Sequence, residues 1–316
     1  MTSRLAERTV AVLGFGNQGE AHALNLRDAG LEVVVGARAG GGAEARSRAL
    51  GFPTLDLPGA ASRAGVVVAL LPDEVLPEVW PAVVRGLAPN AAVVFAHGYN
   101  LLYSELAFPE RGDVVLVSPT APGRVLRATY ERGATLPGYL AVHLDRSGAA
   151  WDLAGEYAGR LGCAPLWRTT VREETEVDLF GEQAVLCGGL HALLTAAFET
   201  LVEQGYAPEM AYLECIHQLK YLADLLHERG LAGVRGAISA TALFGDFTRG
   251  PRVVNETTRR ELRTMLEEIR DGSFAREWAA EVARGKGWLR ERTGQAAKHP
   301  LEEARRRVLE AGEEGP

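Results

Sequence analysis

Hydrophobic and polar positions follow two different patterns in the two parts of the chain. Up to about residue 170, short apolar runs recur, and each is followed by a loop and a helical pattern. Such runs are typical of buried parallel strands. They lie at residues 9–13, 31–35, 65–71, 91–96, 113–117 and 139–144, with helical stretches between them that include 75–86 and 151–161. This alternation predicts an α/β fold with a Rossmann-type, doubly wound parallel sheet.

After Thr170 the strand patterns stop and helical periodicity runs nearly to the end of the chain. Glycines at 205, 230 and 272 are placed as helix stops. The predicted helices lie at residues 174–204, 208–229, 256–271 and 273–284, and a charged, solvated tail helix begins at about Pro300. The pattern therefore predicts a dinucleotide-binding domain over residues 1–170 and an all-helical domain over 171–316.

A glycine-rich turn lies between the first predicted strand and the helix after it. Its glycines have the GxGxxG spacing, and the next strand follows the helix. The first two glycines allow a tight turn and a close approach of backbone to a pyrophosphate, and the third lets the helix pack on the strand. The helix N-terminus then faces the phosphates. We expect a dinucleotide to contact the whole turn: Gly14, Phe15, Gly16, Asn17, Gln18 and Gly19.

The end of the second strand normally binds the adenosine ribose. Residues 36–44 carry no acid at the strand end, where a carboxylate would bind a free 2′-hydroxyl, and Arg38 suits a 2′-phosphate. A solvated loop arginine is the alternative, and Glu44 lies close enough to complicate the reading. The pattern favours NADPH, with NADH as the other possibility.

Two acidic segments lie within the helical part. In residues 173–183, five carboxylates lead into a long apolar run, and Asp178 and Glu182 are one helical turn apart on one face. Glu214 and Gln218 have the same spacing in a second helix. Carboxylates turned toward one interior repel unless a cation holds them, and oxygen ligands without a thiolate cluster favour Mg²⁺. The alternative is a charge cluster at a helix N-terminus with ordinary salt bridges.

Two isolated polar residues stand where a ligand is expected. His97 follows the strand at 91–96, and ligands on such sheets bind beyond the carboxyl ends of the strands. A role facing substrate or cofactor is as reasonable for it as a structural one. Ser239, in the small polar segment 238–246, suits either a hydrogen bond to a substrate carboxylate or a helix N-cap.

The composition excludes several other classes of protein. A hydrophobic content of 47% and a charged content of 24% are those of a soluble globular protein, and the net charge of −7 argues against general nucleic-acid binding. No run approaches the roughly 20 apolar residues of a membrane span, and the N-terminus lacks the apolar core of a signal peptide. Cys163, Cys187 and Cys215 form no CxxC motif, so we expect them to be reduced and buried in a cytoplasmic protein. Apolar surface on several long helices predicts a homodimer or larger homo-oligomer.

Several longer motifs resemble the ketol-acid reductoisomerase family, in its short form with one knotted helical domain. The most specific are residues 173–189 and 245–252, joined by Leu-Leu-Pro-Asp-Glu at 70–74 and Phe-Ala-His-Gly-Tyr-Asn at 95–100. The resemblance covers nearly the whole chain. It implies a two-step reaction on 2-acetolactate-type 2-hydroxy-3-oxo acids in branched-chain amino-acid synthesis. An alkyl shift at a two-Mg²⁺ centre precedes reduction by NADPH.

The resemblance also implies roles for single residues. Asp178 is similar to the metal-bridging carboxylate, and Glu182 to its partner on the first Mg²⁺. Glu214 is similar to a ligand or close neighbour of the second ion, with Gln218 at a further ligand position, and Ser239 to the serine that binds the substrate carboxylate. On the cofactor side the implied residues are Leu71, Pro72, Asp73, Gly123 and, beside the nicotinamide, His97.

Departures from the family pattern fall on the expected site. Thr120, in the turn Pro-Thr-Ala-Pro-Gly at 119–123, stands where the family has a lysine, and Gln218 stands where it has a second glutamate. One cation and one carboxylate fewer from the protein predict weaker or single-metal occupancy. Gly41 and Ala43 replace serines of the family's phosphate-binding loop, which weakens the expectation of NADPH.

Three functions therefore stay open at this point. The first is a working Mg²⁺-dependent ketol-acid reductoisomerase, supported by the three carboxylates Asp178, Glu182 and Glu214. The second is a diverged reductase that reduces a 2-oxo acid or an imine without the alkyl shift, supported by Thr120 and Gln218. The third is a non-catalytic dinucleotide-binding protein. In the first two, the partner is a small-molecule substrate, with no nucleic acid or membrane.

Overall fold

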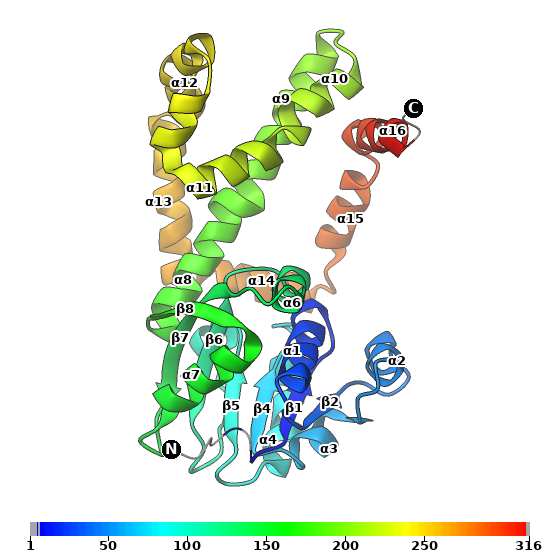
Figure 1. Cartoon of the computed structure of the whole chain (residues 1–316), viewed down its shortest axis with the longest axis vertical. Coiled ribbons are helices and arrows are strands. Elements are labelled where there is room, and N and C mark those ends of the chain that lie inside the picture. The colour runs from blue at the N-terminus through cyan, green and yellow to red at the C-terminus, as the bar shows by residue number, and fades with distance from the viewer. Residues whose placement is uncertain (1–4, 6, 314–316) are drawn as a thin grey trace. The chain divides into compact units, whose positions relative to one another are not determined.

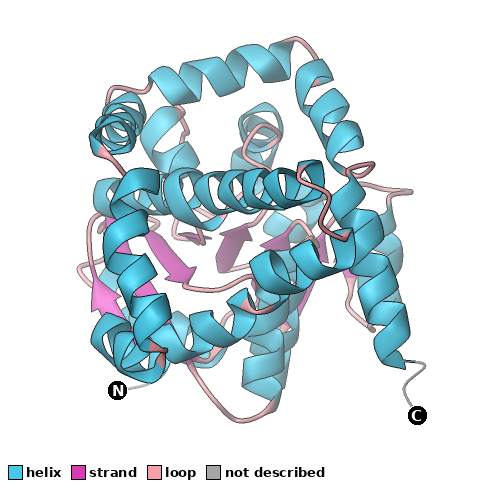
Figure 2. Cartoon of the chain, turned by 90° about the horizontal axis from the view of Figure 1, so that it is seen from above, coloured by secondary structure: helices cyan, strands magenta, loops and turns pink. Residues whose placement is uncertain are grey.

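The computed structural model describes residue 5 and residues 7–313, and the chain forms two compact units (Figure 1). The first unit ends at Val177 and the second begins at Asp178. All strands of the described chain, drawn in magenta in Figure 2, lie in the first unit. The second unit is helical.

The first unit contains an eight-stranded sheet in the order β3-β2-β1-β4-β5-β6-β7-β8. All six predicted strands are present, and the short β3 and the edge strand β8 are additional. The strands are β1 (Val10–Leu13), β2 (Val33–Gly36), β3 (Thr54–Leu55), β4 (Val66–Ala69), β5 (Ala92–Phe95), β6 (Val114–Pro119), β7 (Leu136–Leu144) and β8 (Cys163–Arg168). The helices are α1 (Asn17–Asp28), α2 (Gly42–Ala49), α3 (Leu57–Ala61), α4 (Leu76–Gly86), α5 (Tyr99–Tyr103), α6 (Gly123–Glu131) and α7 (Ala150–Leu161).

The strand pattern predicted a parallel sheet, but the observed sheet is mixed. Strands β1 to β6 are parallel, but β7 is antiparallel to β6, with Pro119 opposite Gly138, and β8 is parallel to β7. The connecting helix α6 packs on α1 instead of carrying the chain back to the start of β6. The chain therefore enters β7 at the end where β6 finishes.

The strands are buried on both faces, which explains their continuous apolar runs. Alternate residues face opposite sides, so Val10 and Val12 join one core and Ala11 and Leu13 the other. Helices α1 and α7 cover the first core, and α3 and α4 cover the second (Figure 1). Loops at the carboxyl ends of the parallel strands are thus held on a rigid frame.

The helical unit contains the predicted helices and two that were missed, α12 and α15. The elements are α8 (Val171–Gly181, which begins in the first unit), η1 (Glu182–Leu186), α9 (Gly188–Glu203), α10 (Pro208–Tyr212), η2 (Leu213–His217), α11 (Leu219–Ala237), α12 (Ala240–Val253), α13 (Glu256–Arg270), α14 (Ser273–Ala283), α15 (Gly287–Ala296) and α16 (Pro300–Glu313). Gly205 and Gly272, at φ 87° and 76°, separate helices as predicted, while Gly230 only kinks α11. The segments η1 and η2 are π-helical turns, which the sequence did not predict.

The expectations for the tail helix and for the cysteines need correction. The tail helix α16 is not fully solvated, because Ala304 is buried and Arg307 pairs with Glu209 of α10 at 3.0 Å. All three cysteines are free, as expected, but only Cys163 is buried and Cys187 is exposed.

One helical run could cross a membrane by length and composition alone, contrary to the expectation. It is Val171–Glu203, whose most apolar 18-residue window has a mean hydropathy of 1.6. The search for a continuous run of apolar residues did not find this helix, because a few polar residues interrupt it. A single such helix is weak evidence for a membrane protein, since helices of soluble proteins pass the same test.

Candidate active site

The glycine turn after β1 has the geometry that a dinucleotide site requires. Gly14 has φ +97°, and a Cβ on it would lie 2.5 Å from the carbonyl O of Leu70. A Cβ on Gly19 would lie 2.1 Å from the carbonyl O of Gly14, so α1 packs directly on the turn. A Cβ on Gly16 would meet nothing within 4 Å. The turn is therefore closed by two glycines and open at the third, where a phosphate can approach.

The three remaining residues of the turn are tied to the protein. Phe15 is buried, with its ring 5.7 Å from that of Phe52, so only its backbone is available to a cofactor. The Asn17 side chain accepts the Arg124 N–H at 3.0 Å, and the Gln18 side chain donates to the carbonyl of Ala121 at 3.0 Å.

Gly123 supports the glycine turn from the other side. A Cβ on Gly123 would lie 2.1 Å from the Asn17 carbonyl O, so the two turns are in direct contact. Thr120, at the position where a lysine is expected, directs both its N–H and its hydroxyl to the carbonyl of Pro137, at 3.1 and 2.9 Å. Its side chain is thus engaged with β7.

Arg38 and Glu44 lie in the loop after β2. Arg38 is exposed and, among the described residues, makes no ion pair. Glu44 accepts the Gly40 N–H at 2.7 Å and pairs with Arg48 at 2.9 Å. The Gly40 N–H, followed by Arg48, holds the pKa of Glu44 below its ordinary value. The Glu44 carboxylate therefore already accepts a hydrogen bond from one backbone N–H of the loop in which a 2′-phosphate would bind.

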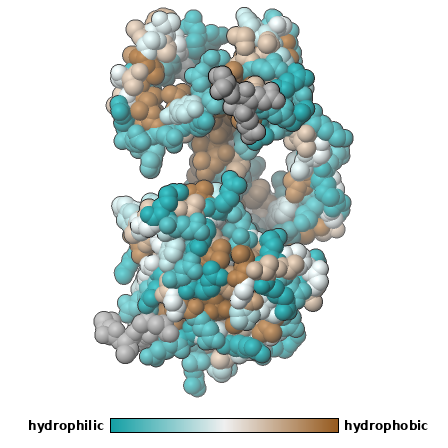
Figure 3. Space-filling model, turned by 45° about the vertical axis from the view of Figure 1, so that its right-hand side comes forward, coloured by the Kyte–Doolittle hydropathy of each residue, from teal (hydrophilic) through white to brown (hydrophobic). Residues whose placement is uncertain are grey.

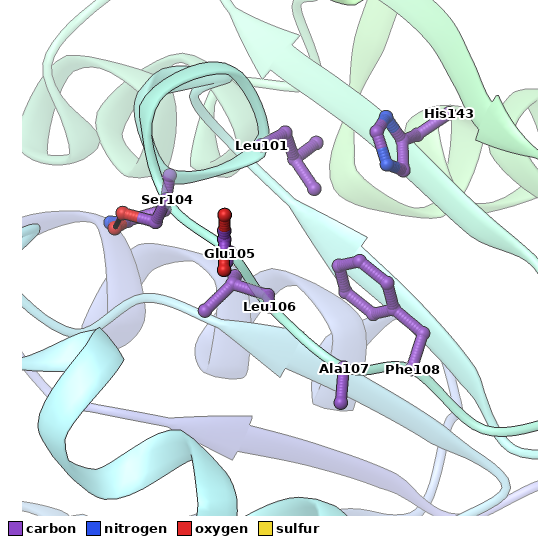
Figure 4. A pocket seen from close by; sticks show the side chains of 8 residues that line it. Leu101, Ser104, Glu105, Leu106, Ala107, Phe108 and His143 are labelled. Atoms are coloured by element: carbon purple, nitrogen blue, oxygen red, sulfur yellow. Dashed lines mark hydrogen bonds between the residues drawn. The ribbon is translucent and has the colours of Figure 1, made fainter.

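The turn after β4 joins the cofactor side to a neighbouring pocket. Asp73 accepts a hydrogen bond from the Asn100 side chain at 2.9 Å, and Asn100 accepts one from Ser104 at 2.7 Å. Asn100 and Ser104 help line a pocket of about 470 Å³, whose other wall includes Phe108 and His143 (Figure 4). Asn100 thus connects this pocket to Asp73. Leu71 and Pro72 lie in the same turn. Leu71 is partly exposed and Pro72 is exposed.

His97 lies at the carboxyl end of β5, as the sequence predicted, and it has a buried acidic neighbour that the sequence did not predict. Glu174 of α8 is 4% exposed, and its Oε1 lies 3.8 Å from His97 Nδ1. Its Oε2 accepts the Gly98 N–H at 3.1 Å. The His97 ring stacks on that of Tyr99, with centroids 6.4 Å apart. A half-buried imidazole thus lies beside a buried carboxylate at the edge where the nicotinamide is expected.

Burial of Tyr99 raises its pKa to about 12, with further contributions from Asp73 and Tyr103. Tyr99 therefore stays protonated and neutral beside His97 at physiological pH. It is an aromatic and hydrogen-bonding neighbour, and not a base.

The five carboxylates of the acidic segment divide into three environments. Glu173 accepts hydrogen bonds from Thr169 and Thr170 at the start of α8, and Glu176 pairs with Arg172 at 3.1 Å. Glu174 faces His97. Asp178 and Glu182 are exposed and lie one turn apart on the same helical run, beyond the capped start of α8 where the exposed Glu173 lies. The charge-cluster interpretation thus fits two of the five residues, and the metal interpretation applies to Asp178 and Glu182.

The predicted ligands do not form one group within a single chain. The described residues contain no set of three or more His, Cys, Asp or Glu side chains that could hold a metal ion. Glu214, in η2, accepts a hydrogen bond from Gln218 at 2.9 Å, and both are exposed. One chain therefore presents two separate pairs of oxygen donors. Oxygen is the donor that Mg²⁺ prefers, so the chemistry of each pair suits this ion.

Ser239 begins α12 as its N-cap, and its Oγ accepts the Ala242 N–H at 3.2 Å. The structure therefore bears out the N-cap reading. A serine hydroxyl that accepts one bond still has its own hydrogen to donate.

A Rossmann-type sheet with a glycine turn after β1 and a histidine beyond β5 defines an oxidoreductase that binds a nicotinamide cofactor. The acetohydroxy acid isomeroreductase NADPH-binding domain matches residues 4–166, and the ketol-acid reductoisomerase C-terminal domain matches residues 171–313. The chain belongs to the ketol-acid reductoisomerase family. The resemblance inferred from the sequence motifs is thereby confirmed.

Solved structures agree with this assignment. An NADH-preferring ketol-acid reductoisomerase from an uncultured archean is 35% identical, with a TM-score of 0.94 over 98% of this chain and 96% of that one. A semialdehyde dehydrogenase NAD-binding protein from Cupriavidus necator is 18% identical, with a TM-score of 0.65 over 84% and 99% of the two chains. The 1-pyrroline-5-carboxylate reductase of Streptococcus pyogenes is 11% identical, with a TM-score of 0.55 over 84% and 98%. The last two share the fold alone.

Proposed function

We propose that this ketol-acid reductoisomerase acts on 2-acetolactate-type 2-hydroxy-3-oxo acids with Mg²⁺ and NADH. The observation that carries the proposal is the pair Asp178 and Glu182. These exposed carboxylates lie one turn apart, on the helical run that also carries Glu174 against His97. The proposed metal ligands therefore follow Glu174 along the same helical run.

The chain's own residues would bind and orient the substrate. Asp178 and Glu182 would hold Mg²⁺, which polarises adjacent hydroxyl and carbonyl oxygens and so favours the alkyl shift. Ser239 would donate its hydroxyl hydrogen to the substrate carboxylate. His97, with the Glu174 carboxylate 3.8 Å away, would lie beside the nicotinamide during reduction of the rearranged 2-oxo acid. Asp73, Leu71 and Pro72 would line the cofactor side.

A second copy of the chain would complete the metal site. The donor pairs Asp178–Glu182 and Glu214–Gln218 form no common group in one chain, and a homodimer can bring the pair of one chain to the pair of another. The second unit also exposes large apolar side chains, many of which Figure 3 draws in brown. Examples are Val185, Leu186, Leu226, Phe244 and Phe247. Burying them against a second copy is favourable and would explain the apolar run Val171–Glu203 without a membrane.

The preferred cofactor is NADH. Glu44 accepts the Gly40 N–H, and its negative charge opposes a 2′-phosphate at the same loop. The archaeal ketol-acid reductoisomerase that is 35% identical prefers NADH, and Gly41 and Ala43 supply no hydroxyl for a phosphate. Arg38 remains the one feature that favours NADPH. The cytoplasmic location that we infer from the free cysteines stays a prediction.

Two substrates separate this function from that of a reductase without the isomerase step. Purified protein with Mg²⁺ and NADH is given 2-acetolactate and, separately, the already rearranged 3-hydroxy-2-oxo acid, and NADH oxidation is followed. We expect turnover of both. Turnover of the rearranged acid alone would show that the alkyl shift is lost, as Thr120 and Gln218 allow. Turnover of neither would contradict the proposal.

A further inference from the structure

A π-helical turn, η1, begins at Glu182, directly after α8 and four residues beyond Asp178. Its defining bond joins the Cys187 N–H to the carbonyl of Glu182 at 2.9 Å, a separation of five residues instead of four. One extra residue in the turn rotates the helix before it by about 100° relative to the helix after it. The π-turn η1 thus sets the direction in which Asp178 and Glu182 face relative to α9.

Two glycines occupy the exit of this turn. A Cβ on Gly188 would lie 2.1 Å from the carbonyl O of Gln183, and a Cβ on Gly189 would lie 2.0 Å from that of Ala184. Both contacts are far inside van der Waals distance, and both are to backbone atoms, which cannot swing away as a side chain can. Every residue other than glycine carries a Cβ, so η1 in its observed form requires glycine at both positions.

This requirement is specific to η1. The other π-turn, η2, is defined by the Gln218 N–H bonded to the Leu213 carbonyl at 3.3 Å, and Leu219 and Lys220 follow it. A π-turn therefore does not need glycines at its exit in general. Gly181, just before η1, is also different, because a Cβ there would meet nothing within 4 Å.

Helix α9 is anchored in the core at Phe198, so a change in η1 would turn the two carboxylates relative to this anchor. Phe198 of α9 is 1% exposed and packs with Ala211 and Tyr212 in the core of the second unit. If η1 reverted to an α-turn, Asp178 and Glu182 would rotate by about 100° at a radius of 5–6 Å, a shift of roughly 8 Å. Mg²⁺ binds oxygen at about 2.0–2.1 Å in a near-ideal octahedron, so no such shift is tolerated.

We propose that Gly188 and Gly189 are positioning residues for the metal site, because they preserve the π-turn that orients Asp178 and Glu182. This inference rests on the proposed Mg²⁺ site. Neither glycine has a side chain that could bind the metal or the substrate. Their effect passes through the backbone of η1 alone.

The test compares Gly188→Ala and Gly189→Ala with Gly181→Ala in the full-length protein. Mg²⁺ binding is measured by calorimetry, NADH binding by fluorescence, and exchange of the Cys187 amide hydrogen by mass spectrometry. We expect both exit variants to weaken Mg²⁺ binding by at least about tenfold and to speed exchange at Cys187. NADH binding in all three variants, and Mg²⁺ binding in Gly181→Ala, should stay within about twofold of wild type.

Two results would overturn the inference: Mg²⁺ affinity in both exit variants equal to that of wild type, or equal loss in Gly181→Ala. Absence of Mg²⁺ binding by wild type, together with faster Cys187 exchange in the exit variants, would instead contradict the proposed metal site and leave the role of the glycines in the turn intact. If the exit variants do not fold, wild type alone suffices. Saturating Mg²⁺ should then slow exchange at Cys187, and unchanged exchange would refute the coupling between turn and metal.

Discussion

Oε1 of Glu174 lies 3.8 Å from Nδ1 of His97, and Oε2 of the same carboxylate accepts the Gly98 N–H at 3.1 Å. One buried acid on α8 thus lies beside the imidazole and binds the backbone at the carboxyl end of β5. Holding a reacting group in one orientation lowers the entropy cost of the chemical step. We therefore propose that Glu174 acts through His97, as a positioning residue for the reduction.

Replacing Glu174 by Gln keeps an oxygen that can accept the Gly98 N–H but removes the charge beside His97. We expect kcat for reduction of the rearranged 2-oxo acid to fall on the order of 10- to 100-fold, with little change in the KM for NADH. Glu173→Gln is the matched control, because the partners of the Glu173 carboxylate within residues 7–313 are Thr169 and Thr170 at the helix start. Equal losses in the two variants would show that Glu174 has no special role.

Gly98 is placed where α8 meets the end of β5. A Cβ on Gly98 would lie 2.0 Å from Oγ1 of Thr175 and 3.1 Å from Oε2 of Glu174. Gly98→Ala should therefore reduce the free energy of unfolding by about 1–3 kcal/mol, the usual cost of overpacking. Adding Thr175→Ala removes the closest atom and should restore part of the loss in urea denaturation. A double variant no more stable than Gly98→Ala would place the strain elsewhere.

The cofactor preference should depend on Glu44. Glu44→Ser removes the negative charge and supplies a hydroxyl at the start of α2, so the ratio of kcat/KM for NADPH to that for NADH should rise on the order of tenfold. Arg38→Ala should raise the KM for NADPH more than that for NADH. If both variants change the two cofactors equally, neither residue lies at the 2′-position of the adenosine ribose.

His22 should make stability depend on pH. It is fully buried, its Nδ1 lies 2.8 Å from the hydroxyl of Tyr157, and burial lowers its pKa from 6.5 to about 3. Between these values the unfolded chain binds a proton that the folded chain does not. The free energy of unfolding should therefore fall as the pH drops below 6.5, by up to ~1.4 kcal/mol per pH unit. Urea denaturation between about pH 6.5 and 5 should show a flatter slope for His22→Gln, and an identical slope would contradict the assignment.

The strands and the glycine turn could be predicted because their signals are local. Val10 to Leu13 and Gly14 to Gly19 are consecutive, and their apolar run and glycine spacing follow directly from strand burial and phosphate approach. The reversal of β7 could not be predicted, because it depends on α6 packing on α1. Short apolar runs do not encode strand direction.

At the site, too, the features that could be predicted from the sequence are the local ones. The spacing of Asp178 and Glu182 was enough to place them on one helix face. Glu174 was missed because its burial against His97 depends on a contact between residues 76 or more positions apart, with no local signature. The π-turns were missed because helical periodicity does not reveal a single inserted residue. The adjacent glycines Gly188 and Gly189 were the one sequence feature that could have indicated η1.

The central claim is that two copies of the chain share each metal site, with Asp178 from one and Glu214 from the other. Asp178→Asn and Glu214→Gln are prepared separately, and each is expected to lose Mg²⁺-dependent turnover of 2-acetolactate. The two variants are then unfolded together, refolded as a mixture and assayed. Random pairing should restore about a quarter of the wild-type sites, since half of the dimers carry one site free of both substitutions. A mixture no more active than the separate variants would contradict the shared site.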